Sequence, residues 1–477
     1  MRIVNNLDAD ALVRYGRRLP VPFALSVISS DGRILDVTVF RVLRLLPSKR
    51  IVAVAEVEGE NFLVKIFIGA HSRRYFQREL SGAKKISAAG VLTAALQWRG
   101  ELKSASAHVL GFEFLEGAKD LLQTLRDSEN NKVELLLVSK LVPVIATLHE
   151  KGVLQNDIHP GNFLFLSESV YTIDGGDVTR RNMRPLSTRK SLDNLALFLA
   201  QFQFLEENIL SACLDKYCQI RGWPLDSNRF EHLTNLIQVK SDQRKRDYVR
   251  KSFRECSQFA SEHTIKRFSV CQRVHDTPAM RNLLNRLDER IASGELLKDG
   301  KSATVALVNG PSGKLVIKRY NIKSLSHGFA RAFQNTRGWV SWANANRLKF
   351  LGIRAVAPVA LVEERIGPIR RRAYFITEYI EGADLMTLAE NDDPSEEIEA
   401  IVKIIKDMFA ARISHGDLKA SNFILASDGP VIIDLDSMKE HRSQFAKHRA
   451  EKRDIARFMK NWSAESRVWN RFADLLF

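Results

Sequence analysis

Three polar residues recur at fixed spacing in two distant parts of this chain. In the second copy Asn422 follows Asp417 by five residues, and Asp434 comes twelve residues later, directly after the apolar residues 431–433. The first copy lies 260 positions earlier and has the same spacings in the set Asp157, Asn162 and Asp174. A repeat of this length is far longer than a solenoid unit. The spacing therefore indicates a tandem of two similar domains.

The residue types in this repeat point to phosphoryl transfer from ATP. That reaction needs a carboxylate to accept the proton of the attacking hydroxyl, and an amide with a second carboxylate to hold Mg²⁺ on the phosphates. We therefore predict Asp157 and Asp417 as catalytic bases. The predicted metal ligands are Asn162, Asp174, Asn422 and Asp434. A polar turn between two strands would explain one such copy, because Asp and Asn are common in turns, but it does not explain the repeat.

A lysine on a strand and a glutamate on the next helix precede the first copy. Residues 37–68 alternate apolar and polar side chains between turn signals, which predicts an antiparallel sheet of three strands. Lys65 lies in the last of these strands, and the helical pattern of residues 72–89 supplies Glu79. Such a pair holds ATP phosphates in kinase-like folds. A lone lysine whose stem lies along apolar surface is the alternative. Glu116 ends the segment that we interpret as a hinge between two lobes.

A similar arrangement of strand lysine, helix and hinge precedes the second copy, but its helix lacks a counterpart of Glu79. Residues 296–320 predict two strands around a turn, and Lys318 takes the place of Lys65. The helix that follows contains no Glu, so this lysine lacks its helix partner. Glu378 belongs to the corresponding hinge, and a turn with Lys301 is a candidate lid over the phosphates. The predicted nucleotide-contacting residues are Lys65, Glu79, Glu116, Lys318, Glu378 and Lys301.

The repeat also sets the predicted domain boundaries in this chain of 477 residues. Residues 1–35 show little pattern and are treated as a lead-in. Residues 36–285 form the first domain, with an extended helical C-lobe and connector, and residues 286–477 form the second, with a short C-lobe. Residues 205–290 are interpreted as helical and charged, without an assigned role.

Composition favours a cytoplasmic protein with an anionic partner. The formal net charge of +16 is typical of proteins that bind nucleic acid, an acidic membrane surface or a phosphorylated substrate. The four cysteines form no CxxC pair, which suits a reducing compartment. No apolar leader begins the chain, and no apolar run approaches the roughly 18 residues of a membrane span.

The motifs HGDLKASN with IDLDS, and NDIHPGN with IDGGD, resemble the protein-kinase-like superfamily. Within it, the segments LVIKRYN and YIEGADL are most similar to the lipopolysaccharide kinase family, which phosphorylates Kdo or heptose sugars of the bacterial lipopolysaccharide core. The resemblance covers about residues 37–200 and 296–460. It implies an α+β fold of two tandem bilobal kinase-like domains, each with a small β-sheet N-lobe and a helical C-lobe.

The resemblance also implies a reaction and a location. ATP and Mg²⁺ would serve transfer to a sugar hydroxyl of an anionic glycolipid, the lipopolysaccharide core. The protein would work in the cytoplasm, peripherally at the inner face of the inner membrane, and nucleic acid would not be its partner.

Both copies depart from the family pattern. The first has Gln155 and Asn156 where His is usual, and the second lacks the helix Glu. One or both copies could therefore be inactive, which leaves a pseudokinase-type regulator or scaffold as an alternative, beside a kinase of another small molecule or a protein. Because the first copy keeps both Lys65 and Glu79, we predict that the first domain is the stronger catalyst. Asp193, with Asp454 as its counterpart, is a candidate brace for the catalytic loop, and a plain acid near the N-terminus of a helix is the alternative for Asp193.

Overall fold

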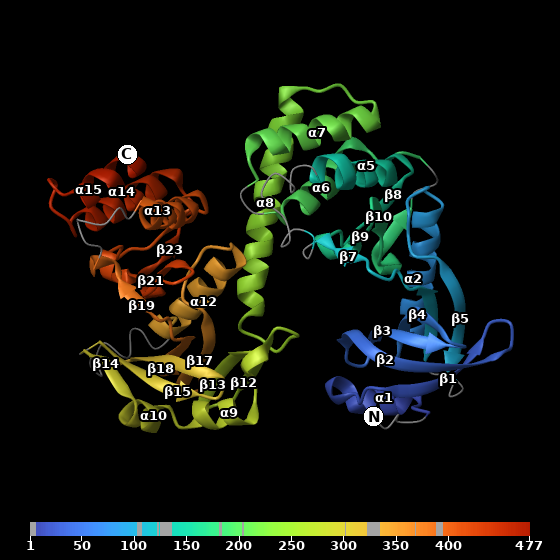
Figure 1. Cartoon of the computed structure of the whole chain (residues 1–477), viewed down its shortest axis with the longest axis horizontal. Helices are drawn as coiled ribbons and strands as arrows, with labels where there is room; N and C mark the ends of the chain where they lie inside the picture. The colour runs from blue at the N-terminus through green and yellow to red at the C-terminus, as the bar shows by residue number, and fades with distance from the viewer. Residues whose placement is uncertain are drawn as a thin grey trace. The chain divides into compact units, whose positions relative to one another are not determined.

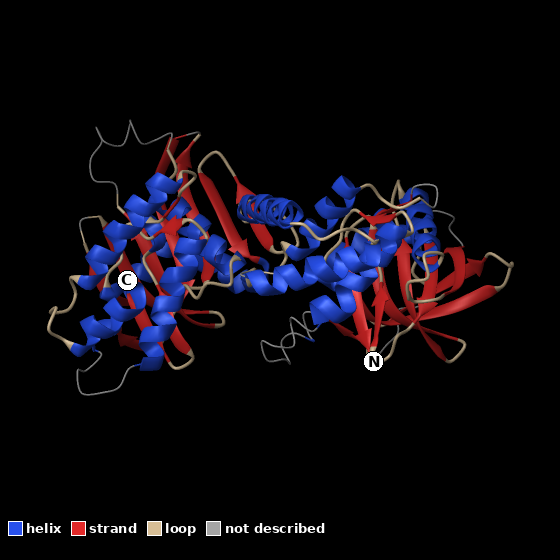
Figure 2. Cartoon of the chain, turned by 90° about the horizontal axis from the view of Figure 1, so that it is seen from above, coloured by secondary structure: helices blue, strands red, loops and turns tan. Residues whose placement is uncertain are grey.

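The chain forms two compact units, Met1–Ser241 and Asp242–Phe477. This computed structural model describes residues 6–102, 107–121, 124, 136–180, 184–202, 205–300, 302–321, 334–367, 369–387 and 395–477. Both units mix helices and strands (Figures 1 and 2), so the α+β prediction is confirmed.

The first half of unit 1 is a closed β-barrel. Its strands, in spatial order, are β1 (Phe23–Ser29), β2 (Ile34–Leu46), β3 (Arg50–Val57), β4 (Glu60–Phe67), β6 (His108–Glu113) and β5 (Leu96–Leu102). The antiparallel pairing of β2, β3 and β4 confirms the predicted sheet. Strand β1 lies in the predicted lead-in, yet its alternating residues are buried and it pairs with both β2 and β5. The lead-in prediction is therefore wrong for this strand, which closes the barrel.

The second half of unit 1 is mainly helical. The helix α2 (Ser72–Ser87) follows β4, and the later helices are α5 (Val142–Glu150), α6 (Thr188–Leu199) and α7 (Glu207–Arg221). Two small sheets accompany them: β7 (Lys119–Asp120) with β9 (Phe163–Leu166) and β10 (Ser169–Thr172), and β8 (Val153–Gln155) with β11 (Val178–Arg180). Their common core includes Ile145, Phe163, Phe198 and Tyr217, all fully buried.

The helix α8 (Ser227–Lys251) runs across the division between the units. Beyond it, β12 (Phe259–His263) pairs with β13 (Arg267–Gln272), which in turn pairs with a strand of unit 2, β17 (Pro358–Ile366). Residues 242–285 therefore belong with unit 2, whereas the sequence interpretation placed them with the first domain and as helical. The difference arises because two short strands within residues 259–272, the edge strand β12 and its neighbour β13, join the sheet through main-chain hydrogen bonds. The charged, helix-rich sequence around them gives no strong signal for these strands.

The sheet of unit 2 is open and has seven strands in the order β12-β13-β17-β18-β16-β15-β14. The remaining members are β14 (Glu295–Asp299), β15 (Ala303–Gly310), β16 (Gly313–Tyr320) and β18 (Ile369–Glu378). Strands β15 and β16 form the predicted hairpin. The helices α9 (Pro278–Asn285) and α10 (Leu287–Ser293) precede β14, and α12 (Arg337–Phe350) packs on the sheet through the fully buried Trp342.

The rest of unit 2 repeats the strand pairing of unit 1. Its small sheets are β19 (Gly382–Asp384) with β21 (Phe423–Ala426) and β22 (Gly429–Ile432), and β20 (Ile413–Ser414) with β23 (Lys439–Glu440). The helices α13 (Ser395–Ala410), α14 (Gln444–Met459) and α15 (Arg467–Leu476) pack around them. Among the residues described in both units, no helix is long and apolar enough to cross a membrane.

Candidate active site

The asparagine of each copy, Asn162 or Asn422, forms hydrogen bonds that build the same turn in both units. In unit 2 the Asn422 side chain donates from Nδ2 to the Asp417 carbonyl oxygen over 2.8 Å, and the Ile433 N–H donates to the Asn422 carbonyl over 2.8 Å. Asp434 follows with a left-handed backbone, φ 59°. These contacts bring the three residues of the second copy together at the end of the β21–β22 hairpin.

Unit 1 contains the same turn. Asn162 Nδ2 donates to the Asp157 carbonyl oxygen over 2.8 Å, and the Ile173 N–H donates to the Asn162 carbonyl over 2.8 Å. Asp174 also has a left-handed backbone, φ 67°. The sequence repeat is therefore one local structure built twice.

A cavity of about 560 Å³ in unit 2 opens onto the second copy. Apolar residues of the seven-stranded sheet and of the β21–β22 hairpin region line one part of it: Val305, Val316, Phe375, Ile424 and Ile433. The polar part contains Lys318, Asn422 and Asp434, and Glu378 lies at the hinge. An apolar slot that ends in a few convergent polar groups is the usual form of a nucleotide-sized ligand site.

Lys318, which lines this cavity, binds two carboxylates. Its Nζ lies 2.5 Å from Asp434 Oδ1 and 3.1 Å from Asp436 Oδ2. Asp436 also binds Arg337 of α12 over 2.7 Å, and its side chain is only 3% exposed. Burial alone would lower the pKa of Lys318, but the neighbouring Tyr320 and the two carboxylates raise it above the usual value.

Asp436 thus supplies the lysine partner that the sequence analysis found missing. In unit 1 the carboxylate comes from the helix, whereas in unit 2 the helix contributes a cation and the carboxylate comes from the turn after Asp434. The signal for this partner in the sequence is the second Asp of the IDLDS motif.

Two cations hold Asp417, the predicted base of unit 2. Lys419 Nζ lies 2.8 Å from its carboxylate, and Arg457 of α14 also binds it. Burial would raise the pKa of Asp417, but the hydrogen bonds from Lys419 and Arg457 lower it below its usual value. The group is therefore an ionised carboxylate at neutral pH, as a general base must be.

Asp454 of α14 braces the loop that carries Asp417. Its carboxylate accepts the N–H of His415 over 2.6 Å and the N–H of Gly416 over 3.0 Å. Burial lowers the pKa of His415, so this imidazole is neutral, and its Nε2 donates to the Ile433 carbonyl over 3.1 Å. The loop is thereby fixed from two sides.

The bracing residue of unit 1 is Asn194 rather than the predicted Asp193. Asn194 Nδ2 donates to the Gln155 carbonyl over 2.9 Å, directly before the first copy. Asp193 instead pairs with Lys240 over 2.7 Å, and its side chain is half exposed. The adjacent helix positions point to different sides, so the apolar setting alone did not identify the inward-facing one.

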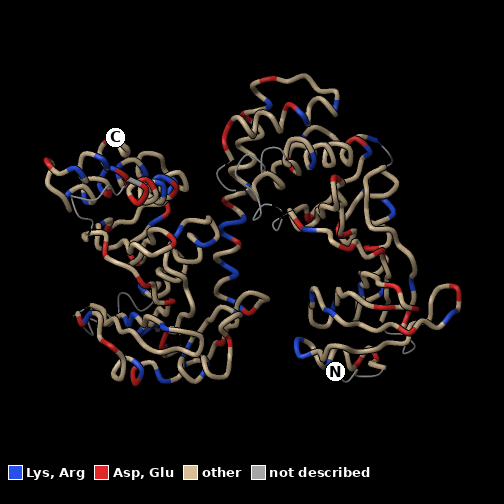
Figure 3. Tube along the Cα trace, in the orientation of Figure 1, with Lys and Arg blue, Asp and Glu red and all other residues tan. Residues whose placement is uncertain are grey.

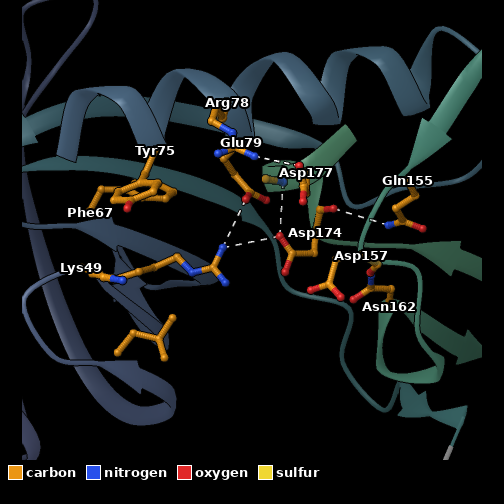
Figure 4. A pocket seen from close by; sticks show the side chains of 13 residues that line it. Lys49, Phe67, Tyr75, Arg78, Glu79, Gln155, Asp157, Asn162, Asp174 and Asp177 are labelled. Carbon is orange, nitrogen blue, oxygen red and sulfur yellow. Dashed lines mark hydrogen bonds and ion pairs between the residues drawn. The ribbon is translucent and has the colours of Figure 1, made fainter. Parts of the chain in front are cut away.

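The cavity of unit 1 is smaller, about 220 Å³, and contains Asp157, Asn162 and Asp174 together with Glu79 (Figure 4). Lys65 forms the predicted ion pair with Glu79, and both side chains are buried. Glu79 also accepts the Gly175 N–H over 3.0 Å. These residues therefore converge as the sequence predicted.

An arginine that the sequence analysis missed lies among these acids. The Arg50 guanidinium lies 3.4 Å from Glu79 and 3.4 Å from Asp174. Burial would raise the pKa of Asp174, but the charges of Lys65 and Arg50 hold it well below its usual range. The available signal was the basic pair of residues 49–50, where the turn after β2 meets the start of β3.

The remaining predicted residues divide into three cases. Glu378 lines the cavity of unit 2. Glu116 is exposed and does not line the cavity of unit 1. Lys301 lies outside the described residues.

The donor set of unit 2 fits Mg²⁺. The hydrogen bond from Asn422 uses Nδ2, which leaves Oδ1 for a cation, and Asp434 contributes a carboxylate in the same cavity. Amide and carboxylate oxygens are the ligands that Mg²⁺ prefers. In unit 1 the carboxylate of Asp174 already has the Arg50 guanidinium as a neighbour.

The C-terminal part of the chain matches a known protein family. Residues 298–475, which lie within unit 2, match the model of the "Lipopolysaccharide kinase (Kdo/WaaP) family". The family resemblance predicted from the sequence is thus confirmed for this segment. Among solved structures, the chain is similar to "WaaP in complex with acyl carrier protein", with 20% sequence identity and a TM-score of 0.35, over 43% of this chain and 88% of that chain. A search of curated proteins found no match.

Proposed function

We propose that this protein is an ATP-dependent phosphotransferase whose second unit phosphorylates a sugar hydroxyl, heptose or Kdo, of the lipopolysaccharide core. The observation that carries the proposal is the unit 2 cavity, where an apolar slot ends at Lys318, Asn422 and Asp434 inside the segment that matches a lipopolysaccharide kinase family. Two tandem bilobal kinase-like domains would account for the strand pairing that the two units share.

The residues of unit 2 would divide the reaction as follows. The apolar slot would hold the adenine, and Lys318 would contact the phosphates. Asn422 and Asp434 would hold Mg²⁺, which neutralises charge on the phosphates when bound. The acceptor hydroxyl would attack the γ-phosphorus and lose its proton to Asp417, while the bond to the β-phosphate oxygen breaks and ADP leaves.

The first unit would have a supporting role, contrary to our expectation from the sequence. Its cavity is less than half the volume of the other, 220 against 560 Å³. Its potential metal ligand Asp174 has the Arg50 cation 3.4 Å away, and like charges close together compete for one carboxylate. The retained Lys65, Glu79, Asp157 and Asn162 would then serve the fold or a bound partner more than turnover, as in the pseudokinase alternative.

The acceptor and the place of action follow from charge. A net charge of +16 suits an anionic glycolipid acceptor and peripheral association with the inner face of the inner membrane better than a neutral sugar in solution. Nucleic acid would compete for such a surface but needs none of the residues in the cavity.

The test is a phosphorylation assay on lipopolysaccharide core with the full-length protein. Mass spectrometry of the core acceptor should show one added phosphate with wild type, and about a hundredfold slower transfer with Asp417→Asn, since a general base contributes a factor of this order. The matched variant Asp157→Asn changes the same position of the first copy and should retain transfer. Loss in Asp157→Asn with full activity in Asp417→Asn would reverse the assignment. If the protein releases ADP from ATP but core acceptor does not stimulate this release, the kinase proposal stands and the proposed substrate is rejected.

A further inference from the structure

The outer side of α14 carries a strip of basic side chains and one aromatic ring. Residues 442–460 contain seven Lys or Arg and two carboxylates. Five of the basic residues are exposed and form no ion pair with the described parts of the chain: Arg442, Arg449, Lys452, Arg453 and Lys460. We call these five residues, together with Phe445, the α14 face.

The members of the α14 face lie on one side of the helix. Residues 445, 449, 452, 453 and 460 follow the spacing of three and four that places side chains on a common side. The opposite side holds Ala450, Asp454 and Phe458, which are buried in the unit 2 core. Because packing fixes the buried side, the basic side cannot turn inward.

The positive charge of this face is not neutralised by its own helix. Glu451 pairs with Lys447 over 3.1 Å, and Asp454 accepts backbone N–H groups of the catalytic loop. Figure 3 shows Lys and Arg segments, together with Asp and Glu segments, on the helices near the C-terminus. The face therefore offers cations to an external anion.

Phe445 decides between a soluble anion and a lipid surface. Its side chain is 79% exposed in the first turn of α14, beside Arg442 and Arg449 along the strip. An inorganic polyanion such as polyphosphate has no apolar group to place against an isolated phenyl ring, whereas an interfacial helix places such a ring at the level of the acyl chains and its Lys and Arg on lipid phosphates. We propose that the α14 face binds the surface of a bilayer that contains anionic phospholipid.

This surface is connected to the candidate active site through the same helix. Arg457 binds Asp417, and Asp454 braces the loop that carries it. Docking of the α14 face would hold the base close to the headgroup region, where a glycolipid acceptor presents its sugars. This last step rests on the proposed function. The binding of the bilayer assigns a surface to the peripheral association proposed there, and it can be tested without the kinase reaction.

Vesicle flotation with the full-length protein, without ATP, tests the proposal. Wild type should bind vesicles with about 30% phosphatidylglycerol at least tenfold more tightly than pure phosphatidylcholine vesicles, and less tightly as salt increases. The double variant Lys452→Glu with Arg453→Glu should lose about tenfold on the anionic vesicles. Phe445→Ser should lose several-fold on the same vesicles because it removes the apolar contact.

The matched control is Arg73→Glu with Arg74→Glu on α2, an exposed basic pair that undergoes the same change of charge. Equal loss in this control would show a nonspecific effect of net charge and overturn the proposal. Unchanged vesicle binding in the α14 variant, or no vesicle binding by wild type, would do the same. If the α14 variant loses soluble polyphosphate as well, while Phe445→Ser binds vesicles normally, the partner is a soluble polyanion and the bilayer is excluded. Because the assay contains no kinase step, its result is independent of phosphotransferase activity.

Discussion

The guanidinium of Arg50 lies 3.4 Å from the carboxylate of Asp174, the first-copy counterpart of Asp434. In unit 2 the corresponding carboxylate contacts a lysine, Lys318, from the position expected of a phosphate clamp. Both cations contact two acids: Lys318 contacts Asp434 and Asp436, and Arg50 contacts Glu79 and Asp174. They differ because Lys318 takes the place of the clamp lysine in the repeat, whereas Arg50 adds a second positive charge to that of Lys65 beside Asp174. This difference separates two sites with the same repeated Asp and Asn residues.

Removal of Arg50 should strengthen divalent-cation binding in unit 1. We expect Arg50→Ala to increase Mn²⁺ affinity at this site about tenfold, since a full positive charge 3.4 Å from the ligand is lost. Titration calorimetry in an Asp434→Asn background isolates the first site. Arg78→Ala is the control, because Arg78 lines the same cavity but pairs with Asp177. Equal Mn²⁺ affinity with and without Arg50 would contradict the role assigned to it.

Asp436 should position Lys318 for ATP. Asp436→Asn leaves Arg337 and Lys318 with one fewer carboxylate, so we expect kcat/KM for ATP to fall about tenfold, or roughly 1.4 kcal/mol. Asp428→Asn is the control, because Asp428 is exposed and pairs with Arg354 away from the cavity. The double variant Ser341→Glu with Asp436→Asn tests geometry, since Ser341 of α12 lines the same cavity as Lys318 and its replacement would return a carboxylate to the helix. Partial recovery of kcat/KM is expected; a wild-type rate in Asp436→Asn alone would refute the positioning role.

The sequence could predict the local parts of these sites and not their remote contacts. The Asp and Asn residues of each copy lie within 18 positions and are joined by a hairpin, so their convergence follows from short-range structure. The ion pair of Lys65 with Glu79 could also be predicted, because its two residues lie on a strand and on the helix that follows it in the sequence.

The contacts that distinguish the two sites involve distant residues. Arg50 and Asp174 are 124 positions apart, and Arg337 and Asp436 are 99 apart. Neither hydrophobic periodicity nor motif spacing predicts contacts between residues so far apart in the sequence. The predicted domain boundary at residue 285 differs from the observed boundary at residue 241 for a related reason. Strand β13 joins the sheet by pairing with β17, almost a hundred residues later in the chain.

Arg457 should set the acid limit of activity. Lys419 and Arg457 lower the pKa of Asp417 against the effect of its burial. Loss of one cation leaves the burial in place, so Arg457→Ala should raise the pKa and move the acid limb of the kcat/KM profile to higher pH. Arg453→Ala, on the exposed side of the same helix, should leave the limb in place when the acceptor is soluble. A profile of Arg457→Ala that coincides with wild type would show that Asp417 does not govern this limb.

His149 should make unit 1 less stable in mild acid. Burial holds the pKa of this imidazole at about 4, although Asn194 accepts its Nε2–H over 3.0 Å. The ordinary value is 6.5, so the unfolded chain takes up a proton first as the pH falls. The contribution to stability is complete above about pH 6.5 and is lost towards about pH 4, which amounts to about 2 kcal/mol by pH 5.

Hydrogen exchange of the amides in α5, α6 and α7 can measure this loss within the full chain at about pH 7 and about pH 5. Their protection should fall in wild type by more than intrinsic exchange rates explain. His149→Gln removes the titrating group while its amide can still donate to Asn194, so this variant should show little change of stability with pH. His448→Gln is the control, because His448 is exposed on α14 and should leave the pH dependence intact. If His149→Gln keeps the full pH dependence, another group in unit 1 is responsible.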